Sequence, residues 1–347
     1  MRTLLLGVAV AALAALGGNR PAAAKDYTFA LVPKNLNNPF FDQARDGCMR
    51  AAKEISDKGA DKVSCQYIGP PEHGGGEEQL QIVNDLIAKH VSGLSVSPSN
   101  AAAVATALRR AKQDKIPVIT FDSDLLPKDK GLRLAYVGTN NYDIGVNLAK
   151  LVQNIKPQGG TICIQSGGAA AANHNERMQG IRDTLAGKKS DAAPGARLTG
   201  QNGWKEVDGC PLYTNDDFVL AVQQMEDVLG KYPTLDAFVP TGGFPQFVPE
   251  AYRRVAQKYK DRIQSRQLAL VVADTLPVQI QLLNDGLSLG QVGQRPFEMG
   301  YKSMYMLLDA VHGEKLQDPT YTGLDICTPR TPTPASEGPA RPAPLRC

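Results

Sequence analysis

Hydrophobic residues along the chain come in short apolar runs that alternate with longer stretches of mixed polarity. Runs of about four to eight mostly apolar residues predict β-strands buried in a sheet. The stretches between them place apolar residues three and four positions apart, which predicts amphipathic helices. The expected strands cover residues 28–32, 62–68, 93–97, 116–121, 134–137, 160–164, a segment near Arg197, 237–240, 268–273 and 289–294. The expected helices cover residues 39–56, 77–89, 101–112, 142–155, 175–185, 218–229, 247–258, 277–284 and 299–312.

The order of these elements predicts the fold class. Strands that alternate with helices pair in parallel through right-handed crossovers, and the helices then cover both faces of the sheet. One series of such units ends before Asn140, and a second series of similar length begins there. We therefore expect an α/β protein with two Rossmann-like, doubly wound parallel-sheet lobes.

The first 24 residues differ from the rest of this 347-residue chain. Arg2 precedes an apolar run, residues 4–16, that is too short to cross a bilayer, and residues 22–24 are alanines typical of a cleavage site. We expect residues 1–24 to be a secretory signal peptide that is removed, and the mature protein to be exported. An uncleaved membrane anchor is the alternative.

The charge of the mature chain is close to balanced. Without Arg2 and Arg20, 36 basic residues face 35 acidic ones, a net charge of +1. Since no long basic run is present either, the sequence offers no electrostatic surface for nucleic acid. At its end, residues 328–347 are rich in proline and poor in residues that can pack, so we expect a disordered or extended tail.

Six cysteines fit an oxidising compartment. None forms a CxxC pair, and the four histidines lack the spacing of zinc ligands, so we expect no metal and no cofactor. Cys48, on the first helix, and Cys65, on the next strand, are close enough in chain and topology to form a disulfide. For a second disulfide we favour Cys210 with Cys327.

One motif suggests an enzyme, a secreted serine esterase. Residues 286–290 read Gly-Leu-Ser-Leu-Gly, residues 73–76 read His-Gly-Gly-Gly, and Asp309 and His312 follow Ser288 in the order of a serine hydrolase. A nucleophile elbow, however, needs a strand before the serine and a helix after it. Ser288 stands after a predicted helix and before a predicted strand, so the sequence favours the reading that the chain is not an enzyme.

Polar and aromatic residues recur where predicted strands end. Because the carboxyl ends of parallel strands open onto one crevice, we expect these side chains to meet there and to bind a ligand. For single residues other roles remain open: Asp274 could cap a helix, and Phe40 and Phe41 could be core residues rather than a ligand platform. The residues concerned are Asn38, Phe40, Phe41, Asp122, Ser123, Arg177, Asp274 and Gln294.

Such a set of side chains suits a sugar. Carboxylate, guanidinium and carboxamide groups can engage neighbouring hydroxyls in pairs, while aromatic rings pack on the C–H faces of a sugar ring. The set contains neither an activated nucleophile nor a metal ligand cluster. It therefore indicates binding rather than turnover.

These residues lie in motifs that resemble those of periplasmic sugar-binding proteins of ABC transporters, in particular the ribose-binding group of the type I family. The similarity extends over roughly residues 25–327, with the motifs in the same order. They are Asn-Asn-Pro-Phe-Phe at 37–41, Pro-Val-Ile-Thr-Phe-Asp at 117–122, Asn-Glu-Arg-Met-Gln-Gly at 175–180, Ala-Asp at 273–274 and Gly-Gln at 293–294.

The resemblance implies a periplasmic protein whose two lobes are joined by a three-segment hinge and close on a monosaccharide or polyol. The hinge segments are expected near Thr139, Gln294 and Leu324. One lobe would then comprise residues 25–139 and 295–323, and the other 140–294 and 324–327. The expected partner is a membrane ABC permease, and the chain is expected to act as a monomer.

Three positions depart from the ribose-binding pattern. Ser123 stands where that group has an arginine, Asn-Asp-Asp at 215–217 replaces an aromatic residue, and Thr-Gly-Gly at 241–243 replaces Asn-Asp. We include Asp216 and Thr241 among the candidate ligand residues. A different sugar, a polyol or a substituted sugar fits better than ribose, and Asp216 leaves an amine-bearing ligand open.

Two further functions share this fold. A regulator of the lactose-repressor type would carry a helix-turn-helix at its N-terminus, where this chain has the expected signal peptide. A sugar sensor that presents its bound state to a chemoreceptor or kinase is not separated from a transport protein by sequence.

Overall fold

The structure is a computed structural model that describes residues 24–72, 76–329 and 347. The expected signal peptide lies outside these residues except for Ala24, as do His73 of the His-Gly-Gly-Gly motif and residues 330–346 of the proline-rich tail. Within the described part of the chain, no helix combines the length and apolar character needed to cross a membrane.

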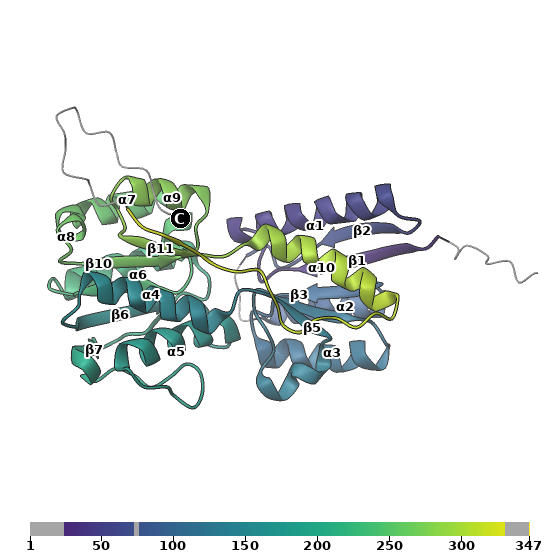
Figure 1. The fold of residues 1–347 in the computed structure, drawn as a ribbon, viewed down its shortest axis with the longest axis horizontal. Coiled ribbons are helices and arrows are strands. Elements are labelled where there is room, and N and C mark those ends of the chain that lie inside the picture. The colour runs from purple at the N-terminus through teal and green to yellow at the C-terminus, as the bar shows by residue number, and fades with distance from the viewer. Residues whose placement is uncertain (1–23, 73–75, 330–346) are drawn as a thin grey trace, which may run out of the picture.

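Two α/β lobes lie side by side along the long axis of the molecule (Figure 1). The first lobe contains a parallel six-stranded sheet of order β12-β5-β4-β3-β1-β2. The second contains a seven-stranded sheet of order β13-β11-β10-β9-β6-β7, with β8 also paired to β6. Only β13 runs antiparallel to its neighbour among the described strands. The expectation of two doubly wound lobes is confirmed.

The strands of the first sheet are β1 (Asp26–Val32), β2 (Lys62–Tyr67), β3 (Gly93–Val96), β4 (Val118–Phe121), β5 (Ala135–Gly138) and β12 (Thr320–Tyr321). Those of the second are β6 (Gly160–Ser166), β7 (Trp204–Glu206), β8 (Leu212–Tyr213), β9 (Ala237–Pro240), β10 (Ala269–Ala273), β11 (Gly290–Gly293) and β13 (Asp325–Cys327). The α-helices are α1 (Pro39–Lys58), α2 (Glu77–Ala88), α3 (Ala101–Gln113), α4 (Asn141–Ile155), α5 (Ala172–Ala186), α6 (Phe218–Lys231), α7 (Pro249–Lys258), α8 (Lys260–Gln264), α9 (Pro277–Asn284) and α10 (Pro296–Val311). Three 3-10 helices, η1 (Pro127–Leu132), η2 (Gln201–Gly203) and η3 (Phe244–Phe247), complete the described elements.

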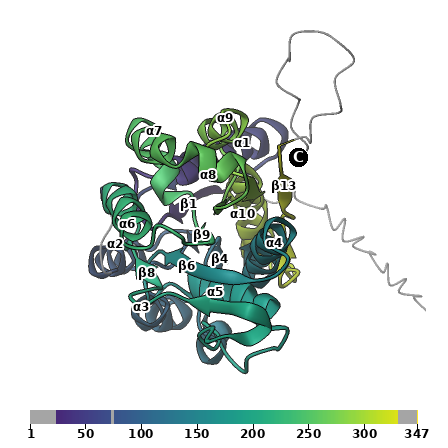
Figure 2. The same cartoon turned by 90° about the vertical axis from the view of Figure 1, so that its left-hand side faces the viewer.

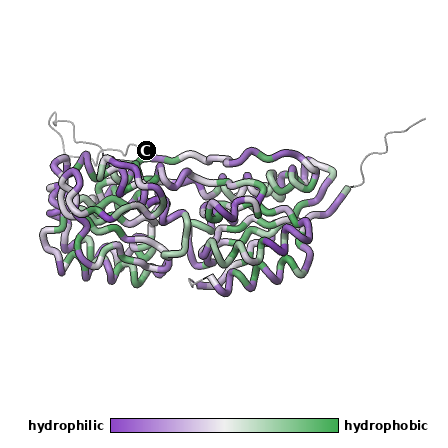
Figure 3. Tube along the Cα trace, turned by 90° about the horizontal axis from the view of Figure 1, so that it is seen from below, coloured by the Kyte–Doolittle hydropathy of each residue, from purple (hydrophilic) through white to green (hydrophobic). Residues whose placement is uncertain are grey.

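Each sheet has a hydrophobic core on both faces. In β1, Phe29 and Leu31 face α1 and α10, while Ala30 and Val32 face α2 and α3, because successive side chains of a strand point to opposite faces. In the second lobe α4 and α5 cover one face and α6 to α9 the other (Figure 2). Hydrophobic and hydrophilic positions alternate along the outer helices, as the sequence pattern predicts (Figure 3).

The chain passes between the lobes three times in its described part. Residues 139–140 connect β5 to α4, residues 294–295 connect β11 to α10, and residues 322–324 connect β12 to β13. The first and third connections lie together, since the Thr139 hydroxyl donates to the Gly323 carbonyl over 3.0 Å.

Several local expectations need correction. Arg197 is not in a strand; the edge strand β7 begins seven residues later, at Trp204. Helix α5 begins at Ala172 rather than at residue 175, which places two more polar residues in its first turn. Periodicity defines helix ends poorly, because the first turn depends on capping rather than on the apolar stripe.

The cysteine pairing is partly as expected. The Cys48–Cys65 disulfide is confirmed, but the pairing of Cys210 with Cys327 is wrong: Cys210 bonds Cys163, and Cys327 bonds Cys347. Three strands separate β13, which carries Cys327, from β6 and the β8 strand beside it. Four strand spacings amount to about 19 Å, far beyond the reach of a disulfide.

Glycines allow the helix pair α4 and α5 to pack with their backbones in contact. A Cβ atom on Gly145 would overlap the carbonyl oxygen of Arg177, and one on Gly180 would overlap that of Tyr142.

We expect Gly145→Ala to lower the free energy of unfolding by about 1–3 kcal/mol, because the helices must move apart. Denaturant titration measures this. Gly230→Ala is the control: its Cβ meets nothing within 4 Å, so it should be neutral or stabilising. Equal stability of the two variants would contradict the prediction.

Candidate functional site

The carboxyl ends of strands from both sheets border one narrow pocket between the lobes, with a free volume of only about 20 Å³. It is lined by Lys34, Asn38, Phe40, Phe41, Asp122, Asn173, His174, Arg177, Asp216, Gly242, Phe244, Phe247, Asp274 and Gln294. Eight of these were expected from the sequence. Of the ten candidate residues, only Ser123 and Thr241 are not in the wall.

The turn between β1 and α1 brings two aromatic rings to the cavity. The Asn38 side chain caps α1 by accepting from the backbone N–H of Phe40 over 3.0 Å, and Pro39 occupies the first helical position. Phe40 and Phe41 are only 4% and 2% exposed and also belong to the core of the first lobe. Phe41 packs edge-to-face on Phe121, with ring centroids 5.9 Å apart. The two rings are therefore both core residues and cavity wall.

Asp122 joins the lobes. It follows β4 with a positive φ of 58°. Its carboxylate accepts from Ser97 of its own lobe over 2.8 Å, and it lies 3.6 Å from the Lys34 ammonium. From α5 of the other lobe, Asn173 donates over 3.3 Å and Arg177 over 3.5 Å. Lys34 also donates to the side-chain oxygen Oδ1 of Asn173 over 2.9 Å. One carboxylate thus holds contacts from both sides of the cavity.

Arg177 is fixed by three hydrogen bonds and is 1% exposed. Besides its contact with Asp122, its Nε donates to Asn141 and its Nη1 to the Thr241 carbonyl, both over 2.9 Å. The Thr241 hydroxyl shares a 3.1 Å hydrogen bond with His174 Nδ1. Thr241 therefore supports two wall residues without being one itself.

Two further carboxylates belong to the second lobe. Asp274 follows β10 with a φ of 74° and accepts from Gly243 N–H over 3.0 Å and from Gln294 Nε2 over 2.8 Å. Complete burial raises its pKa above the usual value. The Gln294 carbonyl oxygen is buried and has no hydrogen-bond partner among the described residues, so it is an acceptor available to a ligand. Asp216 lies 3.8 Å from His174 Nε2.

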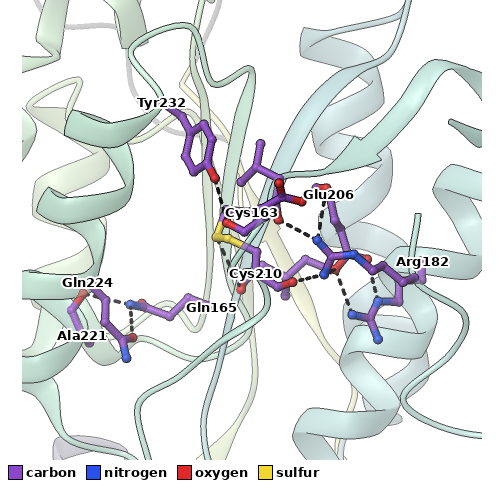
Figure 4. The surroundings of a disulfide bond; sticks show 12 residues. Cys163, Gln165, Arg182, Glu206, Cys210, Ala221, Gln224 and Tyr232 are labelled. Atoms are coloured by element: carbon purple, nitrogen blue, oxygen red, sulfur yellow. Dashed lines mark hydrogen bonds and ion pairs between the residues drawn. A yellow bond between two sulfur atoms is a disulfide. The ribbon is translucent and has the colours of Figure 1, made fainter. Parts of the chain in front are cut away.

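The segment that leads to Asp216 is held by a disulfide and an ion pair (Figure 4). Cys163 on β6 bonds Cys210. Nearby, Arg182 engages the fully buried carboxylate of Glu206 through two hydrogen bonds of 2.8 and 2.9 Å. Bidentate pairs of this kind fix geometry as well as contributing energy. The loop before Asp216 is therefore anchored to the second sheet and to α5.

Six wall residues were not among the candidate ligand residues chosen from the sequence. Phe244 and Phe247 follow β9 on η3, and Phe244 packs on His174 with centroids 5.2 Å apart. The rule that strand ends carry ligand residues would have found them had it been extended past residue 243. Lys34 directly follows β1 and Pro33, so the same rule applies to it. Asn173 and His174 were hidden by the late helix start, and Gly242 has no side chain to signal its position.

His174 should make stability fall at acid pH. Burial, and then the charges of Lys34 and Arg177, hold its pKa well below 6.5. Below that pH the unfolded chain binds a proton that the folded chain does not, so the free energy of unfolding falls, by up to about 1.4 kcal/mol per pH unit. Denaturant titrations of wild type and His174→Gln between pH 5 and 7.5 measure the difference. Parallel curves for the two proteins would contradict the prediction.

The esterase motif does not assemble. Ser288 is fully buried beside β11 and receives a hydrogen bond from Gln291 over 3.3 Å, whereas His312 pairs with Asp61 of the first lobe over 2.8 Å. In the part of the chain that the structure describes, no three His, Cys, Asp or Glu residues are grouped to hold a metal ion.

Comparison with known proteins finds relatives along nearly the whole chain. A family model described as a periplasmic binding protein domain matches residues 29–315. The ribose import binding protein RbsB of Escherichia coli (strain K12) is 26% identical over 309 residues, which cover 89% of this chain and 92% of RbsB. An ABC transporter solute-binding protein from Burkholderia graminis C4D1M, solved in complex with D-arabinose, is 29% identical with a TM-score of 0.70, covering 87% of this chain and 95% of that one. GanP, a glucose-galactose binding protein from Geobacillus stearothermophilus, is 26% identical with a TM-score of 0.71 and covers 87% and 96%.

Proposed function

Because this chain belongs to the periplasmic binding protein domain family, we propose that it captures a monosaccharide or related polyol between its lobes and delivers it to an ABC permease. The observation that carries the proposal is the composition of the cavity wall. Aromatic rings, carboxylates and cationic donors from both lobes line one pocket between the lobes. A hydroxyl both donates and accepts hydrogen bonds, so a polyhydroxylated ligand can use every one of these polar groups.

The charges in the wall favour a neutral ligand. Lys34 and Arg177 both lie within 3.6 Å of Asp122, so the carboxylate that joins the lobes is already matched by positive charge. An amine placed there would meet two cations. An amine-bearing ligand would have to direct its charge toward Asp216 or Asp274 instead, and burial raises the pKa of Asp274. We therefore propose that a sugar or polyol without an amine is preferred.

Ribose is not the proposed ligand. The aromatic residue that the ribose-binding group has before α6 is replaced here by residues 215–217, and Phe244 on η3 supports a ring contact from another element. Lys34 adds a long cationic side chain to the wall of the first lobe. These changes alter the shape and the donor set of the cavity, which supports a sugar or polyol of different stereochemistry.

Capture requires the lobes to move. A ligand that contacts both walls binds the closed form more tightly than the open one and so shifts the equilibrium toward closure. We propose that the three connecting segments, residues 139–140, 294–295 and 322–324, form the hinge. Closure would present one shape to the permease when the site is occupied. Export through a signal peptide at residues 1–24, into the periplasm, belongs to the same proposal.

A thermal-shift screen of the purified mature chain against monosaccharides, polyols and amino sugars tests the function. A ligand at about 100 times its dissociation constant adds about 2.7 kcal/mol to the free energy of unfolding, which raises the melting temperature measurably. We expect at least one neutral sugar or polyol to do so and to be recovered unchanged. If none raises the melting temperature and calorimetry detects no binding, the proposal fails.

A further inference from the structure

Gln279 lies behind the cavity wall rather than in it. It stands in the first turn of α9 and is fully buried. Its carbonyl oxygen accepts from the backbone N–H of Leu276 over 3.1 Å, which is the half of a capping box that an N3 glutamine supplies. Capping the helix uses this oxygen alone and leaves the amide nitrogen for other partners.

The Gln279 amide nitrogen lies within hydrogen-bond distance of three acceptors. These are the side-chain oxygen of Gln246 at 2.9 Å, the backbone oxygen of Ala273 at 2.9 Å and the side-chain oxygen of Gln291 at 3.3 Å. The three acceptors belong to η3, β10 and β11, three separate elements. A single side chain thus connects all of them.

Each of these three elements carries ligand-site residues close to the acceptor. Gln246 lies between Phe244 and Phe247 on η3. Ala273 immediately precedes Asp274, and Gln291 is three residues before Gln294. Four of the wall residues of the second lobe are therefore positioned by segments that meet at Gln279.

The three glutamines hydrogen-bond one another, and the Gln246 side-chain nitrogen has no partner among the described residues. Gln291 donates to the Gln246 side-chain oxygen over 3.0 Å and to the Gln279 backbone oxygen over 3.1 Å, and all three glutamines are fully buried. Buried amides are costly unless their hydrogen bonds are made, and they fix geometry when they are. An apolar replacement of Gln279 would leave acceptors on all three elements without their common donor.

A second buried glutamine makes comparable hydrogen bonds behind the pocket wall in the first lobe. Gln79, on α2, is fully buried, and its amide nitrogen donates to the backbone oxygens of Pro33 and Ser97, both over 2.8 Å. Pro33 immediately precedes Lys34, and the Ser97 hydroxyl donates to Asp122. Gln79 therefore connects the ends of β1 and β3 behind two wall residues.

We infer that Gln279 and Gln79 are positioning residues, one for each half of the ligand site, that hold strand ends in the geometry that binds the sugar. This inference rests on the proposed function, because it concerns the same cavity. Each lobe then carries a preformed half-site, and closure brings the two halves together without rebuilding either.

The test compares Gln279→Met and Gln79→Met with a matched control, Gln165→Met. Gln165 is another fully buried glutamine of the second lobe, but its amide donates to Ala221 over 2.8 Å and to Gln224 over 3.1 Å on α6 (Figure 4). Among the described residues, its side chain has no hydrogen bond to η3, β10 or β11. Methionine keeps the length of the side chain and removes its hydrogen bonds. Should Gln279→Met not fold, Gln279→Asn, which shortens the side chain by one methylene, replaces it.

Affinity is measured by calorimetry with the sugar that the thermal-shift screen identifies, at a temperature where every variant is folded. We expect Gln279→Met and Gln79→Met to bind at least about tenfold more weakly, as the loss of buried hydrogen bonds predicts, and Gln165→Met to bind within twofold of wild type. All three should melt at a lower temperature. A purely structural role would lower the melting temperatures and leave the affinities equal, which would overturn the inference.

Amide hydrogen exchange needs no ligand, so it tests the positioning role of Gln279 independently of the proposed sugar binding. If wild type binds no sugar, the proposed function fails and exchange alone decides on positioning. Faster exchange confined to residues 242–247, 273–276 and 291–295 in Gln279→Met, and absent in Gln165→Met, would support the inference. Unchanged exchange in these segments would overturn it.

Discussion

Replacing Asp122 with asparagine is expected to weaken sugar binding by about 30- to 100-fold, or about 2–3 kcal/mol. The carboxylate is 3% exposed and faces the Lys34 ammonium and the Arg177 guanidinium. Asparagine keeps the shape but removes the charge, so two buried cations lose their common partner and the ligand loses its strongest acceptor. Titration calorimetry with the screened sugar measures the loss.

Asp129→Asn is the matched control for this substitution. Asp129 is also a buried carboxylate of the first lobe, 8% exposed and 3.2 Å from Arg109, but it does not line the cavity. The Asp129→Asn variant should bind the sugar with the affinity of the wild-type protein. A folded Asp122→Asn protein whose affinity lies within threefold of wild type would remove Asp122 from the binding site.

Phe41→Ala is expected to abolish detectable binding and, in addition, to lower the free energy of unfolding by about 3–5 kcal/mol. The loss of stability is expected because Phe41 is 2% exposed and packs on Phe121 in the core. Removing the ring creates a cavity in the core as well as a gap in the site wall. Denaturant titration and calorimetry measure the two effects separately.

Phe29→Ala separates the two roles. Phe29 belongs to the same core but not to the cavity wall, so its loss should destabilise the protein to a similar degree while the folded fraction still binds sugar. If Phe41→Ala retained wild-type affinity under conditions where it is folded, its ring would be a core residue only.

The sequence predicted those side-chain positions that follow from the topology of a parallel sheet. Asp122 and Asp274 were expected at a common crevice and line the pocket, because each follows a short apolar strand and parallel strands all end at the same edge. Phe40 and Phe41 were placed by Pro39, which marks the first turn of a helix. These inferences need only local sequence and the direction of the chain.

Contacts between distant segments could not be predicted in this way. Nothing near Lys34 in the sequence indicates that its ammonium meets Asn173 of the other lobe, 139 residues away. The partner of Cys210 depended on which strands become neighbours, and the short strand β13 gave no periodic signal. Phe244 was missed because the strand-end rule was not extended past residue 243 to η3.

Gln294 combines two features, since it lines the cavity and lies in one of the segments that connect the lobes. A bound ligand that donates to its carbonyl oxygen would restrain backbone torsions on which separation of the lobes depends. The ligand would then dissociate only when the lobes open, so one step would limit both processes. The residence time of the sugar would follow the rate of that motion, so substitutions at Arg295 that leave every ligand contact in place should change how long the sugar stays bound.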